Sequence, residues 1–322
     1  GGGSTGTLDL GALREISILR ALREGNGHPN VVAIDDVKTA DDNDAEDPGS
    51  GMTGYVGIAM PLFRDGTLKG AIDSGSLNDD ARGRMSIAHG LLSAVSYLHG
   101  NGIVHRDIKP DNVMLVRGED GPDGNGTRAV LIDFSLAKIV DTSIYRARAR
   151  GDDGDILEFG RDEGTTHTPD QGTPTYRSPE VVEGRPYGVE SDCWSVGVVL
   201  LEMMRGRTLE VEKDGAALRL VEEARAALPS RPFPDVVRGL LEVDETKRTA
   251  AREALDCPAF GKFGLEVHER TRHEIDIGEA LPFDDEVDDE EEENGGGGGG
   301  APQAQANGGR KSAGGGGRDP PP

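Results

Sequence analysis

Hydrophobic residues recur at helical spacing in two long stretches of the chain. In the first, an apolar residue occupies every third position and a glycine-rich stop follows at Gly25-Asn26-Gly27: Leu10, Leu13, Ile16, Leu19 and Leu22. From Asn78 to His99 apolar residues again recur at threes and fours, before Gly100-Asn101-Gly102. This pattern predicts two amphipathic helices, each ended by glycine.

Shorter apolar runs indicate strands between these helices. Residues Val31 to Val37 and Tyr55 to Leu62 are predicted to form two short strands paired as a hairpin. Ile58, Ala59 and Met60 are expected to be buried in it. A further apolar run, Ala129 to Ile132, follows the second helix.

Composition divides the chain into an ordered part and polar segments. With 322 residues and 35% apolar content, one main folded domain is expected. We expect a low-complexity start at 1–8, ordered parts at 9–63 and 64–263, and a disordered tail at 264–322, where nine of the ten residues 284–293 are acidic. Stretches 38–54, 118–127 and 141–170, rich in Asp, Gly and Arg, are interpreted as surface loop insertions.

Charge and cysteine content exclude several classes of function. The formal net charge of -24 argues against nonspecific nucleic-acid binding, and no apolar run is long enough for a membrane span. Cys193 and Cys257 are the only cysteines, so a reducing compartment is expected, with both as packing residues. The sequence contains no clear targeting signal.

The polar sequence His105-Arg106-Asp107-Ile108-Lys109-Pro110-Asp111-Asn112 directly follows the second predicted helix, and Asp133-Phe134 follows the apolar run. Phosphoryl transfer needs a carboxylate to orient a hydroxyl and accept its proton, a cation near the migrating phosphate, and oxygen ligands for Mg²⁺. These two motifs provide all three. The competing interpretation is a polar turn beside the end of a strand. It is disfavoured because all eight residues 105–112 match one known catalytic motif and lie between a predicted helix and a predicted strand.

The two motifs resemble the catalytic loop and the metal-binding motif of eukaryotic serine/threonine protein kinases, and the resemblance covers about Asp9 to Phe263. It is closest to the cyclin-dependent and mitogen-activated kinases. It implies a two-lobed α+β fold with a truncated small β lobe and a mainly helical large lobe. It also implies ATP and Mg²⁺ as cofactors and a protein as substrate. The expected location, cytoplasm or nucleus, likewise follows from the resemblance.

The resemblance assigns roles within these motifs. Asp107 corresponds to the catalytic base, Lys109 to the phosphate-contacting lysine, and Asn112 with Asp133 to the Mg²⁺ ligands. His105 and Phe134 correspond to internal packing residues.

Further resemblance lies downstream, in 172–180 and 191–197. Thr173 corresponds to a substrate-loop residue that contacts Asp107 and Lys109, and Asp192 to the aspartate that holds the catalytic-loop backbone. Glu180 is expected to form a structural ion pair with Arg248, for which an ordinary surface charge is the competing interpretation.

Upstream, the segment around Glu15 resembles the regulatory helix of the same kinases, with Glu15 as its ion-pair glutamate. A solvated surface glutamate is the alternative. The resemblance places Met60, Leu62, Phe63 and Met114 around adenine, although alone they would be interpreted as core residues. A cyclin-like or other activator is expected at the Glu15 helix.

Regulation by phosphorylation is a further hypothesis. Thr168 occupies the place of the activating threonine of cyclin-dependent kinases, and three cations correspond to the phosphate-binding positions: Arg14, Arg106 and Lys138. Thr165, Thr166 and Thr173 are weaker alternatives, and an unmodified loop is another.

Two departures from the family stand out. No glycine-rich loop followed by a strand lysine precedes Glu15, and the first lysine is Lys38. Ser135 replaces the glycine expected after Asp133-Phe134, which removes backbone freedom there. We therefore expect the chain to represent part of an ATP-dependent serine/threonine kinase. The alternatives are a pseudokinase that acts as a scaffold and an inactive fragment of a kinase.

Overall fold

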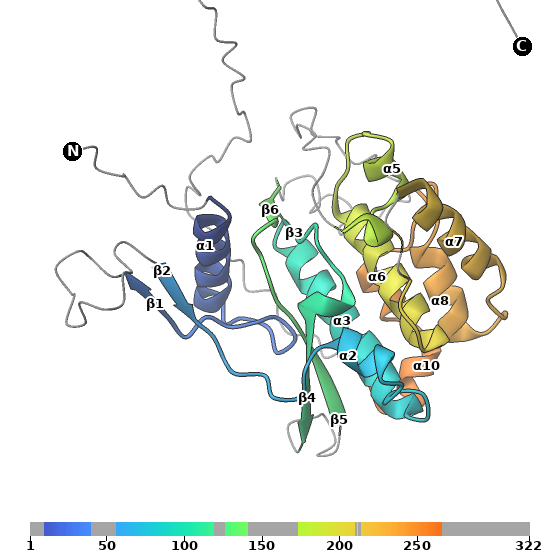
Figure 1. The fold of residues 1–322 in the computed structure, drawn as a ribbon, viewed down its shortest axis with the longest axis horizontal. Helices are drawn as coiled ribbons and strands as arrows, with labels where there is room; N and C mark the ends of the chain where they lie inside the picture. The colour runs from blue at the N-terminus through green and yellow to red at the C-terminus, as the bar shows by residue number, and fades with distance from the viewer. Residues whose placement is uncertain are drawn as a thin grey trace, which may run out of the picture. The chain divides into compact units, whose positions relative to one another are not determined.

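The computed structural model describes residues 10–39, 56–118, 126–140, 173–209, 211 and 214–265. Contacts divide the chain into residues 1–284 and 285–322, and every described residue belongs to the first unit. No helix among the described residues is both long and apolar enough to cross a membrane. Figure 1 shows the arrangement of the helices and strands.

Helix α1 (Leu10–Glu24) forms where the sequence predicts it. It buries the face that carries Ile16, Ile18, Leu19 and Leu22. After the helix, Gly27 takes a φ of 59° and donates its N–H to the Leu22 carbonyl at 2.8 Å. This left-handed conformation, which glycine adopts readily, ends the helix.

The predicted first hairpin is shorter than expected. β1 (Asp36–Thr39) and β2 (Val56–Ala59) pair antiparallel, but residues 31–35 are not a strand. The backbone beside Val31 bonds instead to β5, since the Val32 N–H donates to Leu131 at 2.9 Å. Ala59 and Met60 are exposed, contrary to prediction, because the sheet has only two strands among the described residues, whereas Ile58 is partly buried against the core.

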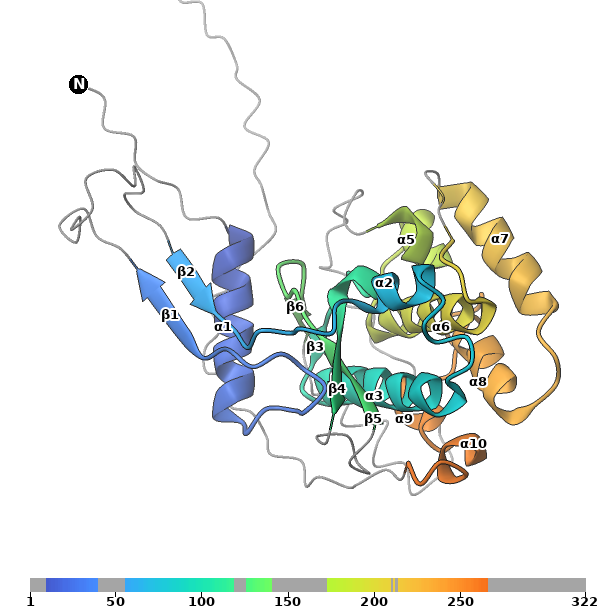
Figure 2. The ribbon, with the colours of Figure 1, turned by 60° about the horizontal axis from the view of Figure 1, so that its bottom comes forward.

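Two more antiparallel pairs position the central loops (Figure 2). β4 (Val113–Gly118) pairs with β5 (Gly126–Leu131), and Val113 lies opposite Leu131. β3 (Ile103–Val104) pairs with β6 (Lys138–Ile139). These pairings place β3, which precedes residues 105–112, beside β6, and β4, which follows those residues, beside β5.

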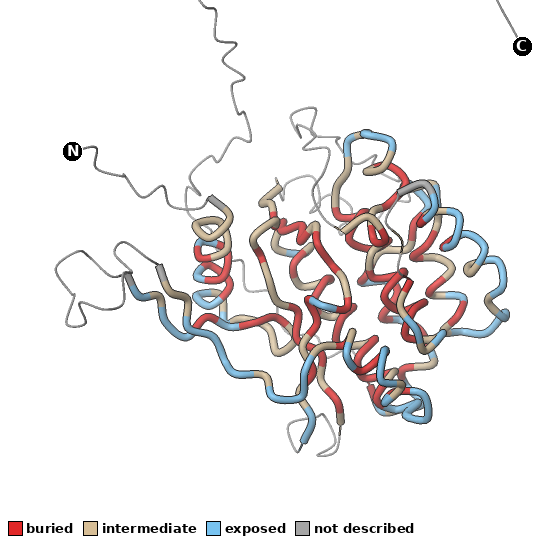
Figure 3. Tube along the Cα trace, in the orientation of Figure 1, coloured by how far each residue is buried: buried red, intermediate tan, exposed pale blue. Residues whose placement is uncertain are grey.

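The remaining described elements are mostly helical. α3 (Ala81–Gly100) and α6 (Val189–Arg205) form the buried centre, drawn mainly red in Figure 3, and pack against each other. Trp194 on α6 and Leu92 on α3 are fully buried. The other elements lie around them: α2 (Leu68–Asp73), η1 (Pro110–Asn112), η2 (Pro174–Tyr176), α5 (Pro179–Val182), α7 (Asp214–Ala226), α8 (Pro232–Leu240), α9 (Ala251–Ala254) and α10 (Pro258–Gly261).

Candidate functional site

One buried carboxylate on α6 binds the backbone of the loop between β3 and η1. Asp192 accepts hydrogen bonds from the backbone N–H groups of His105 at 2.8 Å and Arg106 at 2.9 Å. Arg106 has a φ of 67°, a conformation that costs energy for a residue with a side chain. The carboxylate of Asp192 therefore fixes a strained loop in one shape.

His99 on α3 contacts the same carboxylate, with its Nε2 at 3.0 Å from Asp192 Oδ2. Burial opposes the charged form of His99, but the hydrogen bonds and charges of Asp192 and Cys193 together outweigh it and raise the pKa of His99 to about 10. His99 and Asp192 thus form a buried charged pair beneath the loop at neutral pH.

Asp107 lies at the top of this loop and is only 9% exposed. Its Oδ2 accepts hydrogen bonds from Lys109 Nζ at 2.6 Å and from Asn112 Nδ2 at 3.0 Å. Asn112 Nδ2 also donates to the Asp107 carbonyl at 2.9 Å. One carboxylate oxygen is therefore fixed by two neighbouring side chains, while no hydrogen bond to the other is found among the described residues.

His105 and Phe134 pack together inside the domain, with ring centroids 4.9 Å apart. His105 Nδ1 accepts the Asp107 N–H at 3.3 Å and Nε2 lies 3.1 Å from the Ile132 carbonyl, which fits a neutral ring with its proton on Nε2. Burial lowers the pKa of His105, in agreement with a neutral ring.

Asp133 lies beside Asn112, because the Ile132 N–H donates to the Asn112 carbonyl at 2.9 Å. Asp133 has a φ of 67°, and its Oδ1 accepts the Ser135 hydroxyl at 2.6 Å and the Ser135 N–H at 3.2 Å. Ser135, the departure from glycine, thereby orients the aspartate.

The donor set fits Mg²⁺ only in part. Asn112 Oδ1 and Asp133 Oδ2 accept no hydrogen bond within the described ranges, and Mg²⁺ prefers such oxygen ligands. Among the described residues, no cluster of three or more His, Cys, Asp or Glu side chains could hold a metal. Phosphate oxygens and water would have to complete the coordination of a cation held by Asn112 and Asp133.

Helix α1 reaches the same place through Glu15, whose Oε1 accepts the Phe134 N–H at 3.3 Å. Burial raises the pKa of Glu15, the Phe134 N–H opposes this, and the neighbouring charge of Asp133 adds to it. Among the described residues Glu15 has no cationic partner. The lysine that would complete the predicted ion pair is absent from the described ranges.

The residues predicted to surround adenine differ in exposure. Leu62 is 79% exposed and Met60 is 43% exposed, whereas Phe63 and Met114 are partly buried against the core. Met114 on β4 forms an isolated bridge with Thr67, the residue that caps α2. This bridge brings the segment after Phe63 next to Met114.

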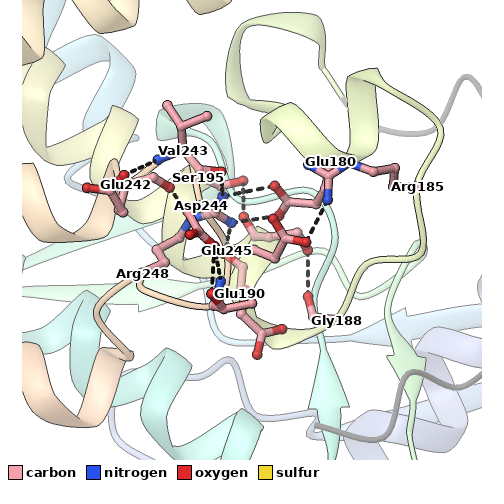
Figure 4. A network of polar contacts seen from close by, with 12 residues as sticks. Glu180, Arg185, Gly188, Glu190, Ser195, Glu242, Val243, Asp244, Glu245 and Arg248 are labelled. Carbon is pink, nitrogen blue, oxygen red and sulfur yellow. Dashed lines mark hydrogen bonds and ion pairs between the residues drawn. The ribbon is translucent and has the colours of Figure 1, made fainter. Parts of the chain in front are cut away.

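Glu180 and Arg248 form a bidentate ion pair, with distances of 2.6 and 2.9 Å between their nitrogen and oxygen atoms. Arg248 is 4% exposed and also donates to the carbonyls of Glu190 and Glu242 at 2.8 Å each, as Figure 4 shows. Although burial disfavours the charged carboxylate, Arg248 lowers the pKa of Glu180. The surface-charge interpretation of Arg248 is therefore wrong.

Thr173 and Asp107 line one small cavity together with Tyr176. Thr173 has no hydrogen bond to Asp107 or Lys109 in the described part of the chain. The segment after Thr173 is bound to α6 at Tyr176, whose carbonyl accepts a hydrogen bond from Ser195 Oγ at 2.8 Å.

The three predicted phosphate-binding cations lie around one short segment. Arg14 NH1 donates to the Ser135 carbonyl at 3.2 Å, and Arg106 Nε donates to the Leu136 carbonyl at 2.5 Å. Lys138 follows two residues later on β6. Thr168 and its alternatives Thr165 and Thr166 lie outside the described residues.

Sequence reasoning missed one buried contact of the site. The Tyr176 hydroxyl lies 3.1 Å from Glu202 Oε2, and Glu202 Oε1 accepts the Leu209 N–H at 2.5 Å. Burial raises the pKa of Glu202 to about 7, although its hydrogen bonds oppose the shift. A glutamate inside the apolar pattern of α6 was the only available signal.

Comparisons with known proteins agree with this geometry. The protein kinase domain family matches residues 6–260. CBL-interacting protein kinase 16 of Oryza sativa subsp. japonica is 32% identical over 77% of this chain and 46% of its own length. The probable serine/threonine-protein kinase KCC4 of Saccharomyces cerevisiae is 29% identical over 78% of this chain and 20% of its own length. The serine/threonine-protein kinase DCLK2 of Rattus norvegicus is 27% identical over 76% of this chain and 27% of its own length. The matched part thus spans less than half the length of these relatives.

Proposed function

Because this chain belongs to the protein kinase family, we propose that it transfers the γ-phosphoryl group of ATP to serine or threonine hydroxyls of protein substrates. The family match confirms the predicted kinase family and α+β fold. The names of the relatives do not support the predicted closeness to cyclin-dependent kinases.

The geometry of Asp107 is the observation that carries this proposal. Lys109 and Asn112 fix one oxygen of the carboxylate at 2.6 and 3.0 Å, and Asp192 fixes the loop below it. Asp107 can therefore orient a substrate hydroxyl and accept its proton. Asn112 and Asp133 would hold Mg²⁺, which would neutralise the charge of the phosphoryl group that ATP supplies.

The test is phosphotransfer from labelled Mg·ATP to a generic basic protein, followed by identification of the modified amino acid. Phosphoserine or phosphothreonine is expected, from the chain as given or extended by upstream coding sequence. Absence of transfer from both proteins would favour the pseudokinase scaffold, for which the supporting observation is that Glu15 has no cationic partner among the described residues.

We further propose that phosphorylation of Thr168 regulates the site. Its support is the placement of Arg14 and Arg106 on neighbouring carbonyls beside Lys138. A phosphate there would join α1, the catalytic loop and the segment after Asp133 through charge-assisted hydrogen bonds. A separate activator that binds α1 would act on the same contacts, since Glu15 and Arg14 both belong to that helix.

A further inference from the structure

A second concave surface lies away from the catalytic loop, between α3, α6, α8 and the end of α10. It encloses about 370 Å³, and it contains none of the residues that surround Asp107. Its apolar lining includes Met85, Met204, Phe233 and Phe263. We call this surface the Met–Phe groove. Methionine side chains adapt readily to irregular apolar partners, so the lining suits an inserted apolar side chain.

Three cations border the Met–Phe groove: Arg84, Arg231 and Lys262. The lining contains no acidic residue, although the chain as a whole carries a formal charge of -24. Arg84 donates to the backbone carbonyls of Leu77 and Asn78. Within the described ranges none of the three cations forms an ion pair with a carboxylate. The groove therefore combines an apolar floor with a positive rim, which suits an acidic peptide with apolar anchors.

The chain itself carries a segment of this chemistry. Residues 274–284 read Glu-Ile-Asp-Ile-Gly-Glu-Ala-Leu-Pro-Phe-Asp and contain four acids and no lysine or arginine. Apolar anchors alternate with those acids: Ile275, Ile277, Leu281 and Phe283.

The start of the connection to this segment lies at the groove. Phe263 and Lys262 line the groove, and Leu265 is buried in the same core. The eight residues 266–273 that separate Leu265 from the segment can extend over about 26 Å. A tether of this length gives an effective concentration in the millimolar range, so weak contacts suffice for binding.

We propose that the segment 274–284 docks in the Met–Phe groove of its own chain. Leu281 and Phe283 enter between the methionine and phenylalanine side chains, and the acids face Arg231 and Lys262. This docking is independent of phosphoryl transfer, because its residues are separate from the catalytic loop.

Photo-cross-linking of the full chain tests the proposal. Phe283 is replaced by p-benzoylphenylalanine, the dilute protein is irradiated, and the cross-linked peptides of the monomer are identified by mass spectrometry. Cross-links to peptides that contain Met85, Met204 or Phe233 are expected. Cross-links elsewhere, no cross-links, or cross-links only between two chains would overturn docking within one chain.

Charge reversal provides the matched comparison. The double variant Arg231→Glu and Lys262→Glu is expected to reduce the yield of groove cross-links about fivefold or more, because two ion pairs are replaced by repulsion. Arg219→Glu, at an exposed arginine of α7 outside the groove, is expected to leave the yield unchanged. Equal losses in both variants, or none in the double variant, would contradict the charge pairing.

Discussion

Glu15 Oε1 on α1 accepts a hydrogen bond from the backbone N–H of Phe134 at 3.3 Å. This bond ties the first helix to the segment that carries Asp133, and it forms without a cation beside Glu15 among the described residues. Glu15 thus contacts this segment through a backbone hydrogen bond, and the described residues provide no ion pair for it.

Replacement of Glu15 by glutamine tests this arrangement. Glutamine keeps the acceptor for the Phe134 N–H but removes a charge whose raised pKa shows it to be unfavourable in the folded state. Because the group is half exposed, we expect a gain of only about 0.5 kcal/mol in the free energy of unfolding at pH 7. Urea denaturation measures it. A clear loss of stability would indicate a cationic partner in residues outside the described ranges.

Glu202 predicts a pH dependence of stability. Burial raises its pKa from 4.5 to about 7 in the folded protein, so the folded state binds a proton more tightly than the unfolded state. Its contribution is therefore lost as pH rises from about 4.5 to about 7. Glu202→Gln should be more stable than the parent at pH 8, by up to about 3 kcal/mol, with a smaller difference at pH 5. Denaturation at both pH values checks this, and a pH-independent difference would contradict it.

The buried pair of Glu180 and Arg248 predicts a large loss on truncation. Arg248→Ala leaves the Glu180 carboxylate buried without its partner, and we expect a cost of about 3–5 kcal/mol. Arg252→Ala, at an exposed arginine, is the control and should cost less than about 0.5 kcal/mol. The double variant Glu180→Ala and Arg248→Ala should cost less than the sum of the single changes. Additive costs would mean that the two residues act separately.

Thr168→Ala tests the proposed regulation. Loss of a phosphate held by Arg14, Arg106 and Lys138 should lower phosphotransfer about tenfold, because charge-assisted hydrogen bonds are removed. Thr165→Ala should retain activity. Mass spectrometry of the active protein should find phosphate on Thr168. Full activity of Thr168→Ala would contradict the hypothesis.

The sequence predicts the long helices better than the small sheet. α1 and α3 follow apolar periodicities that run for several turns and end at glycines. The strand expected at 31–37 does not form over 31–35, because Val32 bonds to Leu131, a partner 99 residues away that the local pattern does not reveal. The exposure of Met60 likewise depends on which strands cover it, which is a tertiary property.

The catalytic loop is predictable for a different reason. Its residues are close in sequence, so the motif itself brings their side chains together. The hydrogen bonds of Asp107 with Lys109 and Asn112 are the example. Contacts between distant segments need the fold. Glu202 meets Tyr176 because α6 packs against η2, and Lys262 and Arg231 line one groove because α10 packs against α8.

Phosphotransfer by Asp107→Asn, measured beside Asp111→Asn, tests the central claim most directly. Asp111 is an exposed neighbour in η1, so its change matches the charge and the location without touching the proposed base. We predict that Asp107→Asn lowers the rate at least about a hundredfold while Asp111→Asn and the parent transfer phosphate alike. Equal activity of all three proteins would contradict the assignment of Asp107 as the base.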